Sequence, residues 1–324
     1  FYQLANWSIS PKEDLMAYAE DTTGRREYNI KFKDLNTGQT YENTLSNSSG
    51  DMAWSSDGRY LFYVLRDKET LLPFKLFRHE IGSSQSEDVL IYEEKDPTFY
   101  LSVGNSRSMQ FIEINISSTT SSEVRLINSD TPEESPYIFL KRELDHLYSI
   151  EHDPENNRFL VETNWLAKNF RLMAIDLKKS TDKNEWSELI PHREDILLQS
   201  ALAFPNHLVI MERENGLRQL KIITKKDNTE RSIIFNDPAY SAYLAANPEY
   251  YSEKFYFGYS SLRTPDSLFS SKLSTGRKRL LKQAEVKGPF SKSDYKVERK
   301  FIEGRDGTLI PVSLVYKRTT FKTN

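Results

Sequence analysis

The sequence predicts an all-β protein built from small antiparallel sheets, and three observations support this prediction. Segments of strand length alternate between apolar and polar residues with a period of two, as residues 28–35 do. These segments are separated by turns rich in Asn, Asp, Gly, Ser and Pro. A pair of strands around such a turn recurs six times along the chain, and no segment has helical periodicity.

The predicted strands follow one another in a fixed order. The six pairs are residues 7–10 with 15–21, 52–55 with 60–67, 99–104 with 109–114, 148–152 with 158–163, 201–204 with 207–212, and 242–246 with 254–260. The spacing of their turns, which fall at Pro11, Asp57, Ser106, Pro154, Pro205 and Pro248, averages about 47 residues. Each pair is followed by two further strands: 28–35 with 39–44, 74–82 with 88–94, 123–128 with 137–141, 170–177 with 186–190, 218–224 with 231–235, and 267–273 with 277–283.

Four antiparallel strands per repeat, at a period near 47 residues, are typical of a β-propeller blade. We therefore predict a propeller over residues 1–287, with six blades at about 1–47, 48–96, 97–143, 144–194, 195–237 and 238–287. A closed six-bladed ring and an incomplete larger ring both fit the repeat. The absence of a Gly-His and Trp-Asp signature disfavours the WD40 class.

The last part of the chain breaks the repeat. Residues 295–303 and 308–317 form a predicted hairpin across Gly304-Arg305-Asp306-Gly307, where the Asp-Gly step favours a tight turn. No third and fourth strands follow. We interpret residues 288–324 as a linker and the opening hairpin of a second domain.

Composition excludes several classes of function. The chain has 324 residues, 44 basic and 47 acidic side chains and a net charge of −3, which argues against nucleic acid or a membrane surface as the main partner. The absence of cysteine excludes disulfides, thiolate metal sites and a cysteine nucleophile. No apolar stretch is long enough for a transmembrane helix or a signal-peptide core.

The motifs of catalysis are missing as well. No Gly-x-Ser-x-Gly elbow occurs, and neither Gly82-Ser83-Ser84 nor Gly258-Tyr259-Ser260 opens a helix. The five histidines show no metal-binding spacing; His192 beside Glu194 comes nearest, and a solvated loop histidine is the favoured interpretation. No phosphate-binding glycine loop is present, so we expect neither a cofactor nor a metal. The residues alone predict a binding or gating scaffold.

One edge of the predicted sheets carries many charges. Because strands alternate in direction, the turn between the second and third strands lies on the same side as the link to the next repeat. A mixed-charge surface suits a reversible contact with another domain or a polar ligand, although loops are also charged simply because they are solvated. The candidates for an interdomain gate on this side are Glu20, Asp21, Arg25, Arg26, Glu93, Glu94, Arg142, Arg193 and Arg263.

Several long strings are recognisable as those of a known family. They include AEDTTGRREYNIKFKDLNTG (19–38), LLPFKLFRHEIG (71–82), EDVLIYEEKDPTFYLSV (87–103), TTSSEVRLIN (119–128), FNDPAYSAYLAANPE (235–249), FGYSSLRTPDSLF (257–269) and GRDGTLIPVSLVYKR (304–318). In order and approximate spacing, the chain resembles the oligopeptidase B (protease II) branch of the prolyl oligopeptidase family of serine peptidases over essentially its whole length.

The resemblance implies a seven-bladed propeller that caps an α/β-hydrolase catalytic domain of the same polypeptide. The six repeats would be blades two to seven, with the first blade lost before Phe1. The parent enzyme would hydrolyse short basic peptides after Lys or Arg through a catalytic triad, in the cytoplasm, with the periplasm also open. The Ser, Asp and His of the family triad would lie beyond Asn324, so no catalytic residue is assigned and the fragment alone should be inactive.

Two other functions stay open on the sequence. One is a free-standing propeller that binds a protein or peptide. The other, a metal- or ligand-dependent hydrolase built on a propeller, has no motif to support it.

Overall fold

The computed structural model describes residues 1–320 and is all-β, as the alternating pattern predicts. Among the described residues, helical structure is limited to five single 3-10 turns: η1 (Gln85–Glu87), η2 (Pro154–Asn156), η3 (Leu177–Lys179), η4 (Lys183–Glu185) and η5 (Lys292–Asp294). None of these is long or apolar enough to cross a membrane. The chain divides into two compact units, residues 1–152 with 175–187, and residues 153–174 with 188 onward.

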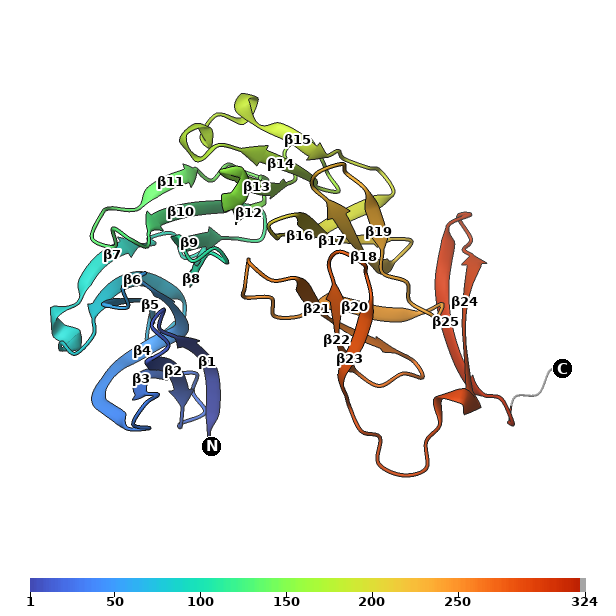
Figure 1. Cartoon of the computed structure of the whole chain (residues 1–324), viewed down its shortest axis with the longest axis horizontal. Coiled ribbons are helices and arrows are strands. Elements are labelled where there is room, and N and C mark those ends of the chain that lie inside the picture. The colour runs from blue at the N-terminus through green and yellow to red at the C-terminus, as the bar shows by residue number, and fades with distance from the viewer. Residues whose placement is uncertain (321–324) are drawn as a thin grey trace. The chain divides into compact units, whose positions relative to one another are not determined.

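The first unit opens with a seven-stranded antiparallel sheet in the order β1 to β7 (Figure 1). Alternate residues of the strands point to its two faces, so that Ala17, Ile30 and Phe32 are buried while their neighbours are not. The strands are β1 (Gln3–Ile9), β2 (Leu15–Asp21), β3 (Tyr28–Asp34), β4 (Thr40–Trp54), β5 (Tyr60–Arg66), β6 (Pro73–Glu80) and β7 (Val89–Glu93).

The sequence predicts separate sheets for the first two repeats, and the structure corrects this. Strand β4 is continuous through the predicted boundary at residue 48, so its first half completes the first repeat and its second half opens the next. Ser48 is the pivot, because it pairs with Tyr28 on one side and with Leu65 on the other. Asn47 (φ 61°) and Gly50 (φ 96°) bend the strand there, and these turn-forming residues account for the predicted break.

The next sheet has four antiparallel strands in the order β11-β10-β9-β8, namely β8 (Tyr100–Asn105), β9 (Phe111–Ser117), β10 (Ser122–Asn128) and β11 (Tyr137–Leu140). Ile112, Ile114 and Ile116 occupy one face of β9 and pack in a core with Phe62 and Val64 of β5. The side chain of Asn105 both accepts from the backbone N–H of Trp54 and donates to its carbonyl, at 2.8 Å each. Apolar packing and this amide together hold the two sheets.

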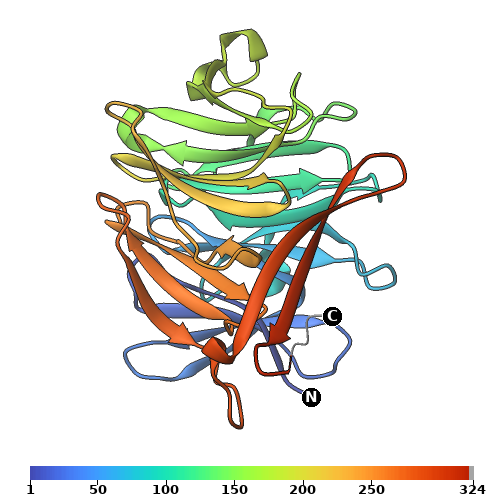
Figure 2. The ribbon, with the colours of Figure 1, turned by 90° about the vertical axis from the view of Figure 1, so that its right-hand side faces the viewer.

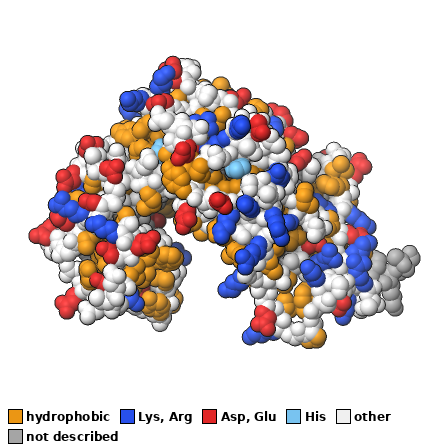
Figure 3. Space-filling view, in the orientation of Figure 1, with side chains coloured by type: hydrophobic (Ala, Val, Ile, Leu, Met, Phe, Trp, Pro, Cys, Tyr) orange, Lys and Arg blue, Asp and Glu red, His pale blue; other side chains and the backbone are white. Residues whose placement is uncertain are grey.

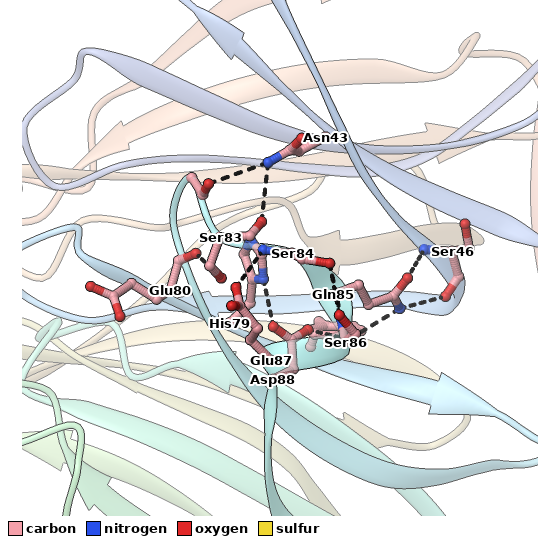
Figure 4. Close-up of polar contacts among 12 residues, drawn as sticks. Asn43, Ser46, His79, Glu80, Ser83, Ser84, Gln85, Ser86, Glu87 and Asp88 are labelled. Carbon is pink, nitrogen blue, oxygen red and sulfur yellow. Dashed lines mark hydrogen bonds and ion pairs between the residues drawn. The ribbon is translucent and has the colours of Figure 1, made fainter.

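A polar loop also fastens the outer edge of the seven-stranded sheet (Figure 4). The segment between β6 and β7 reaches strand β4, where Gln85 exchanges hydrogen bonds with the backbone of Ser46 at 3.0 and 3.2 Å. At the base of the loop the fully buried His79 lies 2.7 Å from Asp88, which also accepts 2.6 Å from the hydroxyl of Tyr63. Because His79 is 0% exposed, this histidine serves packing and cannot reach a ligand.

Three further four-stranded sheets follow, as the repeat predicts. Their strands are β12 (Tyr148–Asp153), β13 (Arg158–Thr163), β14 (Arg171–Ile175) and β15 (Ser187–Ile190), then β16 (Ile196–Ala203), β17 (His207–Glu214), β18 (Leu217–Thr224) and β19 (Glu230–Ser232), then β20 (Tyr240–Leu244), β21 (Lys254–Ser261), β22 (Ser267–Lys272) and β23 (Lys278–Gln283). Strand β19 is shorter than its predicted range of 231–235, although the N–H of Ile233 still bonds the carbonyl of Leu220 at 2.8 Å.

Aromatic side chains build much of the core of the second unit. Phe255, Phe257 and Tyr259 lie on one face of β21 and pack with Val209 and Leu220 of the preceding sheet. Large aromatic side chains bury enough apolar area to compensate for a sequence of only 38% hydrophobic residues.

The chain ends in the predicted hairpin, β24 (Tyr295–Glu303) and β25 (Leu309–Lys317). It forms a two-stranded sheet of its own, visible as a long ribbon in Figure 2. The carbonyl of Gly304 accepts from the N–H of Gly307 at 3.1 Å, and Gly307 has φ 80°, as the tight turn requires.

Candidate functional site

The candidate site is the edge that carries the turns between second and third strands and the links between sheets, which we call the rim. Its residues interleave both signs of charge, and in Figure 3 basic side chains gather over the β20–β23 sheet. In the second unit the chain also leaves this sheet at the rim, because Ser267 pairs with Gln283 and Ala284 donates to the carbonyl of Asp266 at 2.8 Å.

The first two candidates are occupied within their own sheet. Glu20, 8% exposed, lies 2.6 Å from the ammonium of Lys31, and this hydrogen bond lowers the pKa of Glu20 against the opposing effect of burial. Asp21 is fully buried and shapes the following turn. Burial would raise its pKa, but the pKa is lowered overall because Asp21 accepts from the N–H groups of Thr23, Gly24 and Arg26.

Arg25 and Arg26, by contrast, are both exposed at the rim. Arg26 adopts φ 61°, a conformation that non-glycine residues seldom take, and its carbonyl accepts 3.0 Å from Arg66. The backbone of the turn is therefore fixed while both guanidinium groups project into solvent.

Glu94 and Arg142 form a bidentate ion pair between two links of the first unit. The Nη1 and Nη2 atoms of Arg142 donate to the two carboxylate oxygens of Glu94 at 3.0 and 3.2 Å, and the guanidinium lies 4.0 Å from the centre of the Phe99 ring. Burial would raise the pKa of Glu94, but Arg142, the N–H of Asp96 and the Tyr92 hydroxyl lower it overall. The neighbouring Glu93 is more exposed and lies 3.6 Å from Lys75.

The last two candidates are paired with buried acids of the second unit. Arg193 forms an ion pair with Glu212, which also binds Lys221 at 2.9 Å. Burial would raise the pKa of Glu212, and its two cationic partners lower it. Arg263 lies 2.7 Å from Asp237.

Most nominated residues therefore already bond within their own unit, and the structure brings Glu94 together with Arg142 but leaves Arg25 apart. The sequence contains a signal for this pairing in the spacing of the two residues. Arg142 follows Glu94 by 48 residues, close to the repeat length, so opposite charges one repeat apart indicate a contact between neighbouring sheets.

The structure also contains a serine–histidine contact for which the sequence has no motif. The Oγ of Ser108 lies 2.8 Å from Nδ1 of His152. Ser108 lies in the β8–β9 turn, and the next two N–H groups bond to Ser106 and to Ser108 itself. The N–H groups of Met109 and Gln110 are thus already bonded and are not available to hold an oxyanion, as the residues after the serine of an acyl-transfer site would.

Among residues 1–320, no group of three or more His, Asp or Glu side chains is placed to hold a metal ion. His192 and Glu194, the nearest pair in sequence, are 3.9 Å apart, and the Glu194 side chain is 78% exposed.

Comparison with known proteins assigns the fold. The model of the family described as "Prolyl oligopeptidase, N-terminal beta-propeller domain" matches residues 1–284. The chain belongs to this family. Its four-stranded sheets are therefore blades of a prolyl oligopeptidase propeller, and the predicted resemblance is confirmed.

The chain is similar to curated bacterial peptidases. The chain is 38% identical to dipeptidyl aminopeptidase BI of Pseudoxanthomonas mexicana, over 98% of this chain and 43% of the relative. It is 34% identical to protease 2 of Moraxella lacunata, over 93% of this chain and 43% of the relative. The chain thus spans less than half the length of these curated relatives.

Two solved structures have the same fold as this chain. Oligopeptidase B from Leishmania major has a TM-score of 0.90 and 29% identity, covering 98% of this chain and 46% of that one. Oligopeptidase B from Trypanosoma brucei, in a closed form with covalently bound antipain, has a TM-score of 0.88 and 25% identity, covering 99% and 46%.

Proposed function

We propose that this chain is the propeller portion of a serine oligopeptidase that hydrolyses short peptides after Lys or Arg. The observation that carries the proposal is the match of residues 1–284 to the family's propeller domain, in a chain that spans only 43% of protease 2. Under this proposal the catalytic residues belong to another part of the parent polypeptide. The isolated chain should therefore be inactive.

The contribution of the propeller would be to exclude large substrates. Apolar cores and partly buried ion pairs such as Glu94–Arg142 stiffen the sheets, so the propeller would exclude a folded protein while a short peptide could enter. The oligopeptidase B of Trypanosoma brucei is described in a closed form, and we infer the same kind of closure here. Arg25 and Arg26 are the nominated residues best placed for a contact that changes on closure, because both are exposed.

The proposed domain limits are a propeller over residues 1–287 and a linker with the first catalytic-domain hairpin over residues 288–324. The family model ends at residue 284, and the hairpin β24–β25 forms its own sheet, which supports a boundary between them. We further propose a cytoplasmic location, on family resemblance.

A second candidate activity follows from the relative at 38% identity, whose name is dipeptidyl aminopeptidase. An enzyme of that kind requires a free amino terminus, whereas an endopeptidase does not. The two candidates therefore differ in one chemical group of the substrate.

The test uses the full-length protein that contains this chain and two fluorogenic dibasic peptides, one with a blocked and one with a free amino terminus. Hydrolysis of the blocked peptide, abolished by a serine-directed inhibitor, supports the oligopeptidase. Hydrolysis of the free peptide alone supports the aminopeptidase. Failure on both peptides would overturn both proposals and favour a free-standing binding module.

A further inference from the structure

Arg263 contacts two segments that are distant in sequence. Its Nε and Nη2 atoms both lie 2.7 Å from Oδ1 of Asp237, in the link before β20. Its third nitrogen, Nη1, donates 3.3 Å to the carbonyl of Tyr295, the first residue of β24. One guanidinium therefore joins the last blade to the hairpin that leaves it.

The acid that holds Arg263 is itself fixed. Asp237 is 5% exposed, and its Oδ2 atom accepts from Tyr259 at 2.9 Å, Ser261 at 2.7 Å and Thr264 at 3.1 Å. Burial would raise the pKa of Asp237, but these hydroxyls and Arg263 lower it, so the carboxylate is ionised at neutral pH. Arg263 is held in place before it reaches the hairpin, which reduces the entropy cost of that contact.

The segment between β23 and the hairpin has little apolar packing to define its path. Every side chain from residue 284 to residue 294 is exposed. Lys292 and Ser293 line a cavity of about 520 Å³ against the aromatic side chains of Phe235 and Phe257, so space remains behind the segment. The start of the hairpin is therefore set by individual contacts, namely the buried Val297, the stacked rings of Phe290 and Tyr295, and polar contacts such as that of Arg263.

A second arginine, which belongs to the hairpin itself, connects it to a blade farther along. Arg299 of β24 donates to the carbonyl of Asn215, in the turn between β17 and β18. Its side chain comes from the hairpin, whereas that of Arg263 comes from the blade. Of these two arginines, Arg263 is the one bonded to a buried carboxylate of the propeller, Asp237.

We propose that Arg263 is a positioning residue that clamps the exit of the propeller to the start of the following domain. This inference rests on the proposed function in one respect, namely that β24 begins the hydrolase domain. Asp237 and Arg263 stay with the blade when that domain moves, so opening breaks the contact of Arg263 with Tyr295, together with that of Arg299 with Asn215. The clamp favours the closed arrangement and thereby the exclusion of longer peptides.

The decisive variant is Arg263→Lys, in the full-length protein. Lysine keeps a positive charge near Asp237. Its single ammonium, on a flexible side chain, cannot bond to Asp237 and to the carbonyl of Tyr295 at once, as the planar guanidinium does. Arg263→Met removes both contacts. Arg279→Lys is the matched control, since Arg279 is exposed on the adjacent β23 and no hydrogen bond or ion pair of its side chain is found among the described residues.

The first readout is limited trypsin digestion, with the cut after Lys287 followed by mass spectrometry. We expect this cut to be about tenfold faster in Arg263→Lys than in the wild type, because loss of a charge-assisted hydrogen bond frees the segment. The control should cut at the wild-type rate. Should Arg263→Met prove unstable, with cuts throughout the chain, Arg263→Lys still decides.

The second readout is the ratio of kcat/KM for a long and a short basic peptide, which a purely structural role would leave unchanged. We expect Arg263→Lys to shift this ratio at least about threefold toward the longer peptide. An unchanged cut at Lys287 would overturn the clamp even in an active enzyme. A faster cut in a protein without peptidase activity would support the clamp and reject the proposed function, and an unchanged ratio would reject its role in exclusion.

Discussion

The carboxylate of Asp153 accepts a 2.7 Å hydrogen bond from the hydroxyl of Tyr250, which follows it by 97 residues. The same carboxylate binds the ammonium of Lys225 at 2.6 Å and Nε of Arg158 at 3.0 Å. Arg158 begins β13, Lys225 lies in the β18–β19 turn and Tyr250 lies in the segment after β20, so the three partners belong to three consecutive sheets. A single buried acid thus connects the blades of the second unit at the edge opposite the rim.

Tyr250→Phe should destabilise the protein by about 1–2 kcal/mol, because it removes one hydrogen bond to a charged acceptor while keeping the ring. Asp153→Ala should cost about 3–5 kcal/mol, since it leaves the Lys225 ammonium, whose side chain is only 10% exposed, without its carboxylate. Urea denaturation followed by circular dichroism measures both. Tyr251→Phe is the control because Tyr251 is adjacent and 66% exposed. Equal effects of the two tyrosine substitutions would contradict the assigned role of Asp153.

The Glu94–Arg142 pair should make the protein sensitive to acid. The pKa of Glu94 is below its ordinary value of 4.5 in the folded state, so its contribution to stability is complete above that value. The contribution is lost as the pH falls from 4.5 through the folded-state pKa, because Glu94 then becomes protonated in the folded state as it already is in the unfolded state. Glu94→Gln should therefore lower stability at pH 7 by about 1–3 kcal/mol and should flatten its decline below pH 4.5.

Denaturation midpoints at pH 7, 4.5 and 3 test this prediction. Glu93→Gln serves as the control, since Glu93 lies beside Glu94 and its carboxylate forms a longer ion pair, at 3.6 Å with Lys75. If Glu94→Gln declined with pH as steeply as the wild type does, the acid sensitivity would have another source.

Local patterns made the strands predictable. The alternation around Ile112, Ile114 and Ile116 places one face of β9 in a core, and turn residues mark its ends, so neighbouring residues alone contain the information. The fusion of two repeats in β4 was not predictable in this way. Asn47 and Gly50 resemble a turn in sequence, and only pairing of Ser48 with two strands shows that the chain stays extended.

The rim was predictable as a surface but not residue by residue. Strand direction is enough to place Glu94 and Arg263 on one edge of their sheets. Which charges are free depends on burial and on partners about one repeat or more away in sequence, as the Glu94–Arg142 pair shows at 48 residues. The clamp at Tyr295 depends on how the exit segment folds back, for which no local pattern exists.

A carboxyl group on β9 should give the opposite pH dependence. Burial, with a smaller effect of Glu151, raises the pKa of Glu113 to about 8, and no hydrogen bond or ion pair to it is found among the described residues. The folded state keeps this proton between the ordinary value of 4.5 and pH 8 while the unfolded state loses it, so stability falls as the pH rises through that range.

Glu113→Gln should therefore match the wild type near pH 4 and exceed its stability by about 1–3 kcal/mol at pH 9. Urea midpoints at pH 4, 7 and 9 provide the comparison. Glu134→Gln, at an exposed position of the same unit, should show no such divergence. A Glu113→Gln protein that is less stable than the wild type at every pH would mean that the carboxylate has a partner.

A side chain lies directly over the backbone at Gly258, where an added Cβ would be 2.0 Å from Cζ of Tyr243. The two residues are directly paired across β20 and β21, so the ring lies over the glycine. Gly258→Ala should force the Tyr243 ring away and lower the free energy of unfolding by about 1–3 kcal/mol. The displaced ring would also lose the 3.4 Å hydrogen bond from its hydroxyl to Asp266. Adding Tyr243→Ala should recover most of that loss, because the obstructing ring is then gone. A double-mutant cycle by urea denaturation measures the coupling, and purely additive costs would show that the ring does not occupy the space above Gly258.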